Sequence, residues 1–178
     1  MAYRMLKSYN RGGQLIMMNN SYVVIMAGGK GERFWPLSTS KNPKQFLRLL
    51  DNKTMIEKTL AYIKGVVPLE NILVITNIAF SKIVHKLLPQ IPRKNIITEP
   101  LGRNTAPACI LASTTISSRN ENSVICIMTS DHLISNTTVF KKRLKAAFAY
   151  ALQHDTLITF GIKPTKPHTG YGLSLIHI

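Results

Sequence analysis

The feature that most constrains the fold is a glycine-rich loop that directly follows a short apolar segment. Residues 23–27 are all hydrophobic (Val-Val-Ile-Met-Ala), which is typical of a buried strand. Three glycines come next, and their backbone can approach a ligand closely because glycine has no side chain. Two cations follow within the same stretch. In α/β proteins this arrangement is a common way of holding phosphate. The candidate phosphate-binding residues are Gly28, Gly29, Gly31, Arg33 and Lys44.

The spacing of this loop excludes two other phosphate-binding patterns. A dinucleotide-binding fingerprint requires Gly-x-Gly-x-x-Gly or Ala, and counting from Gly29 places Phe34 at the last position. A P-loop requires Gly-x-x-x-x-Gly-Lys-Ser/Thr, and no register of residues 28–46 supplies it. An ordinary glycine turn between a strand and a helix is the remaining alternative. The Trp35-Pro36 pair and the Pro-Lys-Gln-Phe string at 43–46 follow so closely that they favour a functional loop.

Residues 28–46 resemble the GGxGxRxWPxSxxxxPKQF pattern of the sugar-1-phosphate nucleotidylyltransferases. Within this group, the motif is most similar to that of the mannose-1-phosphate guanylyltransferases. The similarity is strongest to the bacterial type related to enzymes fused to a mannose-6-phosphate isomerase. Lys30 stands where that family often has a small residue, and Glu32 is a familiar variant. The resemblance implies that the glycine loop wraps a triphosphate. It also implies that Arg33 neutralises the β- and γ-phosphates and that Lys44 lies by the α-phosphate or the sugar phosphate.

A second motif follows a predicted strand at residues 95–98. Residues 99–108 (EPLGRNTAPA) indicate a turn and then a helix that begins near Asn104. Asn104 or Thr105 can cap this helix, and a proline at 107 is tolerable only in its first turn. Physics alone also allows an ordinary capped junction. The string resembles the EPxGRNTAPA motif of the same family, which implies that four residues help to hold the guanosine: Gly102, Arg103, Asn104 and Thr105.

Asp131 follows a predicted strand at residues 123–128. A carboxylate at the carboxyl end of a buried strand lies where open α/β sheets bind ligands, and its hard oxygens suit Mg²⁺ on phosphates. The alternative is that Asp131 only caps a turn. The family has a similar Asp-His pair whose aspartate binds the metal, so the resemblance implies Mg²⁺ as the cofactor and Asp131 as its ligand. His132 receives no role.

The last motif lies near the end of the chain. Residues 161–172 resemble the family's GIxPxxPxTGYG segment, which approaches the sugar. This implies a sugar-binding role for Gly170, Tyr171 and Gly172. Residues 173–178 depart from the family pattern, and we expect them to be a non-native tail. We expect residues 1–20 to be an unstructured extension and residues 21–172 to be the N-terminal part of a nucleotidyltransferase domain.

Hydrophobic periodicity predicts an α/β fold. A capping box at residues 54–57 should open a helix that reaches about residue 64. Further predicted elements are a strand at 72–76, a helix at 79–88, a long amphipathic helix at 137–154 and a fifth strand at 157–162. Alternating strands and helices predict a doubly wound, mainly parallel, Rossmann-like sheet. The resemblance makes it the nucleotide-diphospho-sugar transferase type, in truncated form.

Composition limits the class of protein. The chain has 178 residues, 45% of them hydrophobic, so it is globular rather than disordered. No apolar run is long enough for a membrane span. Cys109 and Cys126 lie in apolar runs, which predicts buried free thiols and a cytoplasmic location. The net charge of +15 is spread along the chain, which favours small anionic substrates over nucleic acid as partners.

The expected reaction transfers GMP from GTP to α-D-mannose 1-phosphate and gives GDP-mannose and pyrophosphate. GTP and mannose 1-phosphate are then the partners, with no nucleic acid and no membrane, and the oligomeric state stays open. One alternative is a related enzyme that joins UTP or dTTP to glucose 1-phosphate. A second is a nucleotide-binding fragment without turnover, and a third is a nucleic-acid binder.

Overall fold

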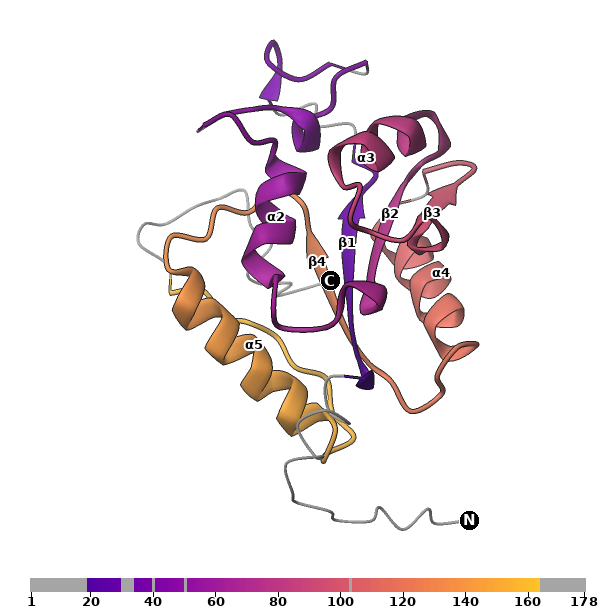
Figure 1. Ribbon diagram of the computed structural model, residues 1–178, viewed down its shortest axis with the longest axis vertical. Helices are drawn as coiled ribbons and strands as arrows, with labels where there is room; N and C mark the ends of the chain where they lie inside the picture. The colour runs from indigo at the N-terminus through magenta and orange to yellow at the C-terminus, as the bar shows by residue number, and fades with distance from the viewer. Residues whose placement is uncertain (1–18, 30–33, 40, 50, 103, 164–178) are drawn as a thin grey trace, which may run out of the picture.

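The computed structural model describes residues 19–29, 34–39, 41–49, 51–102 and 104–163 (Figure 1). Four strands alternate with helices along this part of the chain. The strands are β1 (Ser21–Ala27), β2 (Ile72–Asn77), β3 (Ile96–Glu99) and β4 (Val124–Thr129). The α-helices are α2 (Met55–Ile63), α3 (Ser81–Leu87), α4 (Thr105–Ser117) and α5 (Thr137–Ala151). Short 3-10 helices are η2 (Lys44–Phe46), η3 (Leu69–Asn71), η4 (Ile78–Phe80) and η5 (Arg93–Asn95).

All four strands are parallel and lie in the order β3-β2-β1-β4. The chain therefore builds from β1 outward through β2 to β3, and then returns to place β4 on the other side of β1. Met26 is level with Ile75 of β2 and with Thr129 of β4, so these three strands end at the same edge. Asn77 of β2 is level with Glu99 of β3. The reversal of direction creates a topological switch point between the carboxyl ends of β1 and β4, where open α/β sheets bind ligands.

Helices cover both faces of this sheet, as a doubly wound fold requires. The larger core cluster packs side chains of α2, α3 and α5 against one face, including Ile63, Val84 and Phe148. The smaller cluster packs Ala108, Ala112 and Ile116 of α4 against the other face. Figure 1 shows α2 and α5 on one side of the strands and α4 on the opposite side. Residues Val23, Val24 and Ile25 of β1 have no solvent exposure because β1 is central and covered on both faces.

The helix predicted from the capping box begins where the sequence indicates. The Glu57 backbone N–H donates to Thr54 Oγ1 at 3.4 Å, and the Thr54 backbone N–H donates to Glu57 Oε2 at 2.8 Å. Both halves of the capping box are therefore present. Ile56, Leu60 and Ile63 of α2 are buried on one face, as their spacing predicts.

The predicted fifth strand at residues 157–162 is wrong. Residues 155–163 have no regular structure, and Leu157 and Ile162 are 99% and 84% exposed. An apolar run becomes a strand only when a neighbouring strand offers its backbone, and no described strand pairs with this segment.

The two cysteines are less buried than predicted. Cys109 and Cys126 are free thiols as expected, but each is only half-buried.

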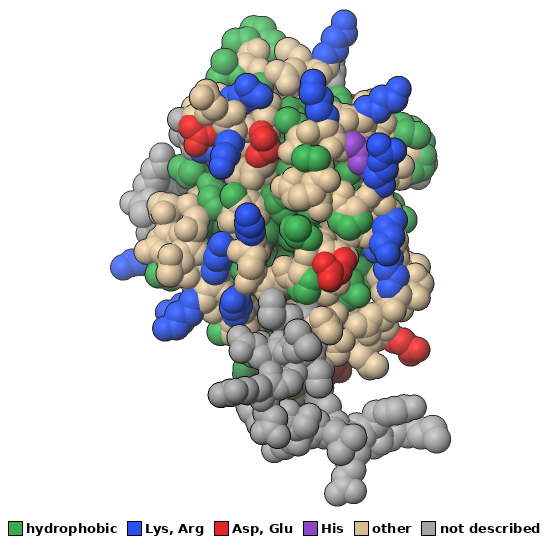
Figure 2. Space-filling model, viewed as in Figure 1, with side chains coloured by type: hydrophobic (Ala, Val, Ile, Leu, Met, Phe, Trp, Pro, Cys, Tyr) green, Lys and Arg blue, Asp and Glu red, His purple; other side chains and the backbone are tan. Residues whose placement is uncertain are grey.

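Positive charge is spread over the surface that Figure 2 shows. Figure 2 shows lysine and arginine side chains scattered over the viewed face, with few acidic side chains among them. Lys142, Arg143 and Lys145 of α5 are exposed and form a solvated helix face. Among the described residues, no helix is both long enough and apolar enough to cross a bilayer.

Candidate functional site

The glycine loop and the predicted metal ligand meet at the switch point of the sheet. Gly28 and Gly29 directly follow β1, and Asp131 follows β4, the adjacent strand. The Ser130 backbone N–H donates to the Met26 carbonyl at 3.2 Å, which continues the pairing of the two strands almost to Asp131. The fold therefore brings together two motifs that are separated by about a hundred residues in the sequence.

The short helix η2 carries Lys44 to the same place. The Gln45 side chain is buried, and its Nε2 donates to the carbonyl of Ala27 at 2.9 Å. The same carbonyl accepts a hydrogen bond of 3.0 Å from Thr76 Oγ1 on β2. Phe46 is buried as well and packs edge-on against Phe80. The Lys-Gln-Phe string is therefore an anchor that fixes the backbone of Lys44 at the carboxyl end of β1.

Lys44 and Asp131 form an ion pair between Lys44 Nζ and Asp131 Oδ2. The two side chains are 20% and 22% exposed, so the pair is largely shielded from water. The ammonium also lies 4.9 Å from the ring centroid of Phe34, within the range of a cation–π contact. Burial by itself would raise the pKa of Asp131. The hydrogen bond and charge of Lys44, together with Thr129 and His132, outweigh burial and lower that pKa, so Asp131 is ionised at neutral pH.

One oxygen of Asp131 fits the predicted role as a metal ligand. Asp131 Oδ1 is buried and has no hydrogen-bond partner among the described residues. A buried carboxylate oxygen without a partner is costly unless something else satisfies it. The described residues contain no group of three or more His, Cys, Asp or Glu side chains that could hold a metal alone. This donor set fits Mg²⁺, which commonly takes one or two carboxylates and completes its shell with water and substrate phosphates.

Glu99 at the end of β3 contacts the glycine loop. A Cβ added to Gly28 would lie 2.9 Å from Glu99 Oε2, so the backbone of Gly28 packs directly against this carboxylate. Glu99 is only 7% exposed, and burial raises its pKa. Glu99 thus reaches past the end of β2 to the loop that follows β1. A Cβ added to Gly29, in contrast, would meet nothing within 4 Å, so that backbone faces open space.

The predicted base-binding segment lies at the start of α4, and its cap differs from prediction. Asn104 occupies the N-cap position, but its side chain makes no capping hydrogen bond. Its backbone has φ 67° and ψ −167°, a region that side chains rarely tolerate. Gly102, Asn104 and Thr105 are all exposed. The helix begins at Thr105 nonetheless, without a side-chain cap from Asn104.

Several predicted site residues lie outside the described part of the chain. These are Gly31, Arg33, Arg103, Gly170, Tyr171 and Gly172. Of the predicted residues that are described, the structure joins Lys44 to Asp131 directly and places Gly28 and Gly29 at the same sheet edge.

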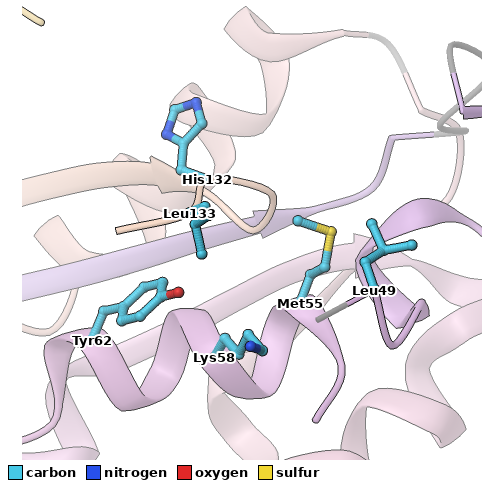
Figure 3. Close-up of a pocket in the computed structure, with 6 residues that line it drawn as sticks. All are labelled: Leu49, Met55, Lys58, Tyr62, His132 and Leu133. Atoms are coloured by element: carbon cyan, nitrogen blue, oxygen red, sulfur yellow. The ribbon is translucent and has the colours of Figure 1, made fainter. Parts of the chain in front are cut away.

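A small pocket lies beside the site, under the segment that follows Asp131. Figure 3 shows Leu133 pointing toward α2, whereas the ring of His132 points away from that helix. The pocket lining is mostly apolar, and we assign it no chemistry. Its residues are Leu49, Met55, Lys58, Tyr62, His132 and Leu133.

Comparison of the sequence with known proteins identifies the family. The profile of the nucleotidyl transferase family matches residues 22–176, which is most of the chain and includes every motif described above. The chain belongs to the nucleotidyl transferase family. The predicted α/β fold and the predicted family are both confirmed.

Curated members of the family resemble this chain closely. A mannose-1-phosphate guanylyltransferase of Klebsiella pneumoniae is 40% identical over 151 residues, which cover 84% of this chain and 32% of the relative. A relative in Salmonella typhimurium, mannose-1-phosphate guanylyltransferase ManC, is 42% identical over 155 residues, 85% of this chain and 32% of that protein. The chain therefore spans about a third of the length of the curated relatives it matches.

Solved structures agree with the fold. The structure described as mannose-1-phosphate geranyltransferase from Thermus thermophilus superimposes with a TM-score of 0.63 at 31% identity, over 71% of this chain and 37% of that one. The mannose-6-phosphate isomerase of Helicobacter pylori superimposes with a TM-score of 0.67 at 23% identity, over 84% of this chain and 53% of that one. The second likeness shows the fold alone.

Sequence reasoning gave no role to three residues of the site. Gln45 and Glu99 lie inside motifs that the sequence analysis singled out, so motif membership was the available signal. Their partners, the carbonyl of Ala27 and the backbone of Gly28, become visible only in the folded chain. Phe34 stood out only as the residue that breaks the dinucleotide fingerprint, and the structure places it under the ammonium of Lys44.

Proposed function

We propose that this chain supplies the nucleotide-binding part of an enzyme that transfers GMP from GTP to α-D-mannose 1-phosphate. The observation that carries the proposal is the meeting of the glycine loop, Lys44 and Asp131 at the switch point of the sheet. The activity printed for the curated relatives, mannose-1-phosphate guanylyltransferase, supports the choice of reaction. We expect the reaction to take place in the cytoplasm, where both substrates are soluble.

In the proposed reaction, a phosphate oxygen of the sugar phosphate attacks the α-phosphorus of GTP. A new P–O bond forms, the bond to the bridging oxygen breaks, and pyrophosphate leaves with the electron pair. Such chemistry requires positioning and neutralisation of charge more than a protein nucleophile. The backbone N–H groups that follow β1 would hold the triphosphate, and Lys44 would contact the α-phosphate or the sugar phosphate. Arg33 would neutralise the departing phosphates.

Asp131 is the residue we propose for holding Mg²⁺. Its Oδ1 is buried without a partner among the described residues, as a metal-binding oxygen would be. When bound, the ion supplies positive charge that neutralises the phosphate oxygens. Before the metal binds, Asp131 is ionised at neutral pH, because Lys44 lowers its pKa against the effect of burial.

Glu99 is our candidate for selecting guanine. Guanine presents two N–H donors on its Watson–Crick edge, and one carboxylate can accept both, whereas adenine offers only one donor beside an acceptor. Glu99 is buried against Gly28, next to the proposed triphosphate loop and at the start of the motif that contains Asn104. Its substitution should therefore change the choice of nucleotide more than the affinity for pyrophosphate.

Two measurements test the proposed function. Thermal unfolding of the 178-residue chain with Mg²⁺ and each of GTP, ATP, UTP and dTTP should show stabilisation by GTP. A ligand at about 100 times its dissociation constant adds roughly 2.7 kcal/mol. A larger shift with UTP or dTTP would replace the proposed nucleotide, and no shift with any nucleotide would refute the binding assignment.

Turnover is best measured in a chimera that continues this chain with the C-terminal two thirds of the Klebsiella relative. Lys44→Ala should lower kcat by on the order of 10²–10³ with the fold intact, since loss of one electrostatic contact to the reacting phosphates commonly costs this much. Lys58→Ala is the matched control. Lys58 is 16% exposed and pairs with Asp51 rather than with Asp131, so its loss should leave kcat within a few-fold. Near-normal turnover of Lys44→Ala would remove Lys44 from the mechanism.

A further inference from the structure

Lys44, the proposed phosphate contact, and Asp131, the proposed metal ligand, form an ion pair with each other. Lys44 Nζ pairs with Asp131 Oδ2, and neither side chain is more than 22% exposed. In a half-buried pair each charge is the main counter-ion of the other, because water screens the charges only in part. Asp131 can accept a cation on both oxygens only when Lys44 Nζ has left Oδ2, and a phosphate that draws the ammonium toward itself weakens this pair.

We propose that Lys44 is a latch that competes with the divalent cation for Asp131, and that the phosphates of the bound nucleotide release it. The inference rests on the proposed function, because it takes the phosphate as the new partner of Lys44. Ion pair and metal are alternatives. Oδ1 has no hydrogen-bond partner among the described residues, and a doubly charged cation held there would be repelled by the ammonium on the other oxygen of the same carboxylate.

The surroundings of Lys44 allow it to change partner without a movement of the fold. Its backbone is held by the hydrogen bond from Gln45 to the carbonyl of Ala27, so the origin of the side chain is fixed beside the glycine loop. The ammonium itself is held only by Asp131 and by the face of Phe34 among the described residues, and a cation–π contact of this kind is weak beside an ion pair with phosphate. A phosphate at the end of β1 would replace the carboxylate as counter-ion, and the freed Asp131 could then bind metal.

The latch has a thermodynamic consequence that a purely structural salt bridge lacks. If nucleotide removes Lys44 from Asp131, nucleotide and cation must strengthen each other's binding by the same factor. Without nucleotide, the cation must displace Lys44 and binds weakly. A salt bridge that nucleotide does not open would weaken cation binding to the same extent with and without nucleotide, and would give no such coupling.

The test measures binding of Mn²⁺ alone to the 178-residue chain, by calorimetry and by the electron spin resonance signal of free Mn²⁺. Lys44→Met keeps an unbranched, slightly shorter side chain and removes its charge. It should bind Mn²⁺ at least about fivefold more tightly than the wild type, the lower end of typical coupling between linked ligands. Lys44→Gln should do the same and serves if the methionine variant is unstable. Adding Asp131→Asn to either variant should abolish the gain.

Lys58→Met is the matched control for net charge. Lys58 is similarly buried and also ion-paired, and it lines the pocket beside His132, but its partner is Asp51. Its loss should leave Mn²⁺ affinity unchanged. Equal affinity in wild type and in both Lys44 variants would overturn the latch. An equal gain in Mn²⁺ affinity in Lys58→Met would also overturn it, because the gain would then come from the lower net charge of the chain and not from the pair at Asp131.

A separate titration with GTP distinguishes this inference from the proposed function. If GTP stabilises the chain but the Lys44 variants bind Mn²⁺ like the wild type, the latch fails and the proposed function stands. If the Lys44 variants bind Mn²⁺ more tightly but GTP has no effect on any chain, the competition at Asp131 stands, and the release by nucleotide fails with the proposed function.

Discussion

Substitution of Gly28 by alanine tests the packing at the centre of the site. The added Cβ would lie 2.9 Å from Glu99 Oε2, about half an ångström inside the 3.4 Å at which ordinary contact begins. Glu99 is 7% exposed and cannot simply swing into solvent. Overpacking of this kind costs about 1–3 kcal/mol, and the end of a side chain gives more easily than backbone, so we expect about 1–2 kcal/mol.

The chain provides its own control in the neighbouring glycine. A Cβ on Gly29 would meet nothing within 4 Å, and neither glycine has a positive φ that would strain alanine. Gly29→Ala should therefore be neutral or stabilise by up to about 1 kcal/mol, through the lower entropy of the unfolded chain. Gly28→Ala should lower the unfolding midpoint by about 2 to 8 °C, since 1 kcal/mol corresponds to roughly 2–4 °C in a chain of this size.

A double-mutant cycle decides whether the Glu99 contact is the cause. Urea unfolding is measured for Gly28→Ala, Glu99→Ser and the two together. Residues in contact typically show interaction energies of about 0.5–3 kcal/mol, and here the double variant should recover most of the loss due to Gly28→Ala. The reasoning is refuted if Gly28→Ala is as stable as Gly29→Ala, or if its cost is the same with serine at 99.

Three further predictions concern single side chains. Burial raises the pKa of Glu99, so folding favours its protonated form and wild-type stability falls as pH rises from the ordinary carboxyl value through the folded pKa. Glu99→Gln should therefore have a higher unfolding free energy than the wild type near neutral pH, and should lose this advantage below about pH 4. Parallel curves of unfolding free energy against pH for the two proteins, from pH 3 to 8, would contradict this. Burial raises the pKa of Cys126 from 9.0 to about 11, so in a Cys109→Ala background its alkylation at pH 8 should be on the order of 100-fold slower than in the urea-unfolded chain. Equal rates would show that the thiolate is not suppressed. The strained backbone of Asn104 predicts that Asn104→Gly gains about 1 kcal/mol of stability, because such conformations cost about 1–3 kcal/mol. The same variant should lose part of the stabilisation by GTP if the side chain binds guanosine, and an unchanged GTP shift would remove that role.

Local sequence determined the helices and strands that are fixed by interactions between residues close together in the chain. The capping box at Thr54 and Glu57 fixes the start of α2 because both hydrogen bonds are local. The apolar run before Gly28 becomes β1, and the proline at 107 falls in the first turn of α4, where its missing N–H costs nothing. The same locality explains the failure at residues 157–162. Their apolar pattern permits a strand, but a strand also needs a partner, and pattern alone cannot supply one.

Motif composition likewise supplied the candidate residues of the site, but not how they meet. Asp131 and Lys44 were each assigned from their own motif, one as a metal ligand and one as a phosphate contact. The sequence contained no sign that they would pair with each other, because that contact depends on the placement of β4 beside β1.

The sequence by itself determined the fold class and the family, and it supplied the candidate residues of the site. These follow from short motifs such as 28–46 and 99–108, which are recognised by the types and spacing of their residues along the chain. Tertiary structure alone decided three things: the order β3-β2-β1-β4, the contact of Glu99 with Gly28, and the ion pair between Lys44 and Asp131. Each depends on contacts between segments far apart in the chain, and the energy of such contacts is set by burial and geometry that exist only after the sheet has formed.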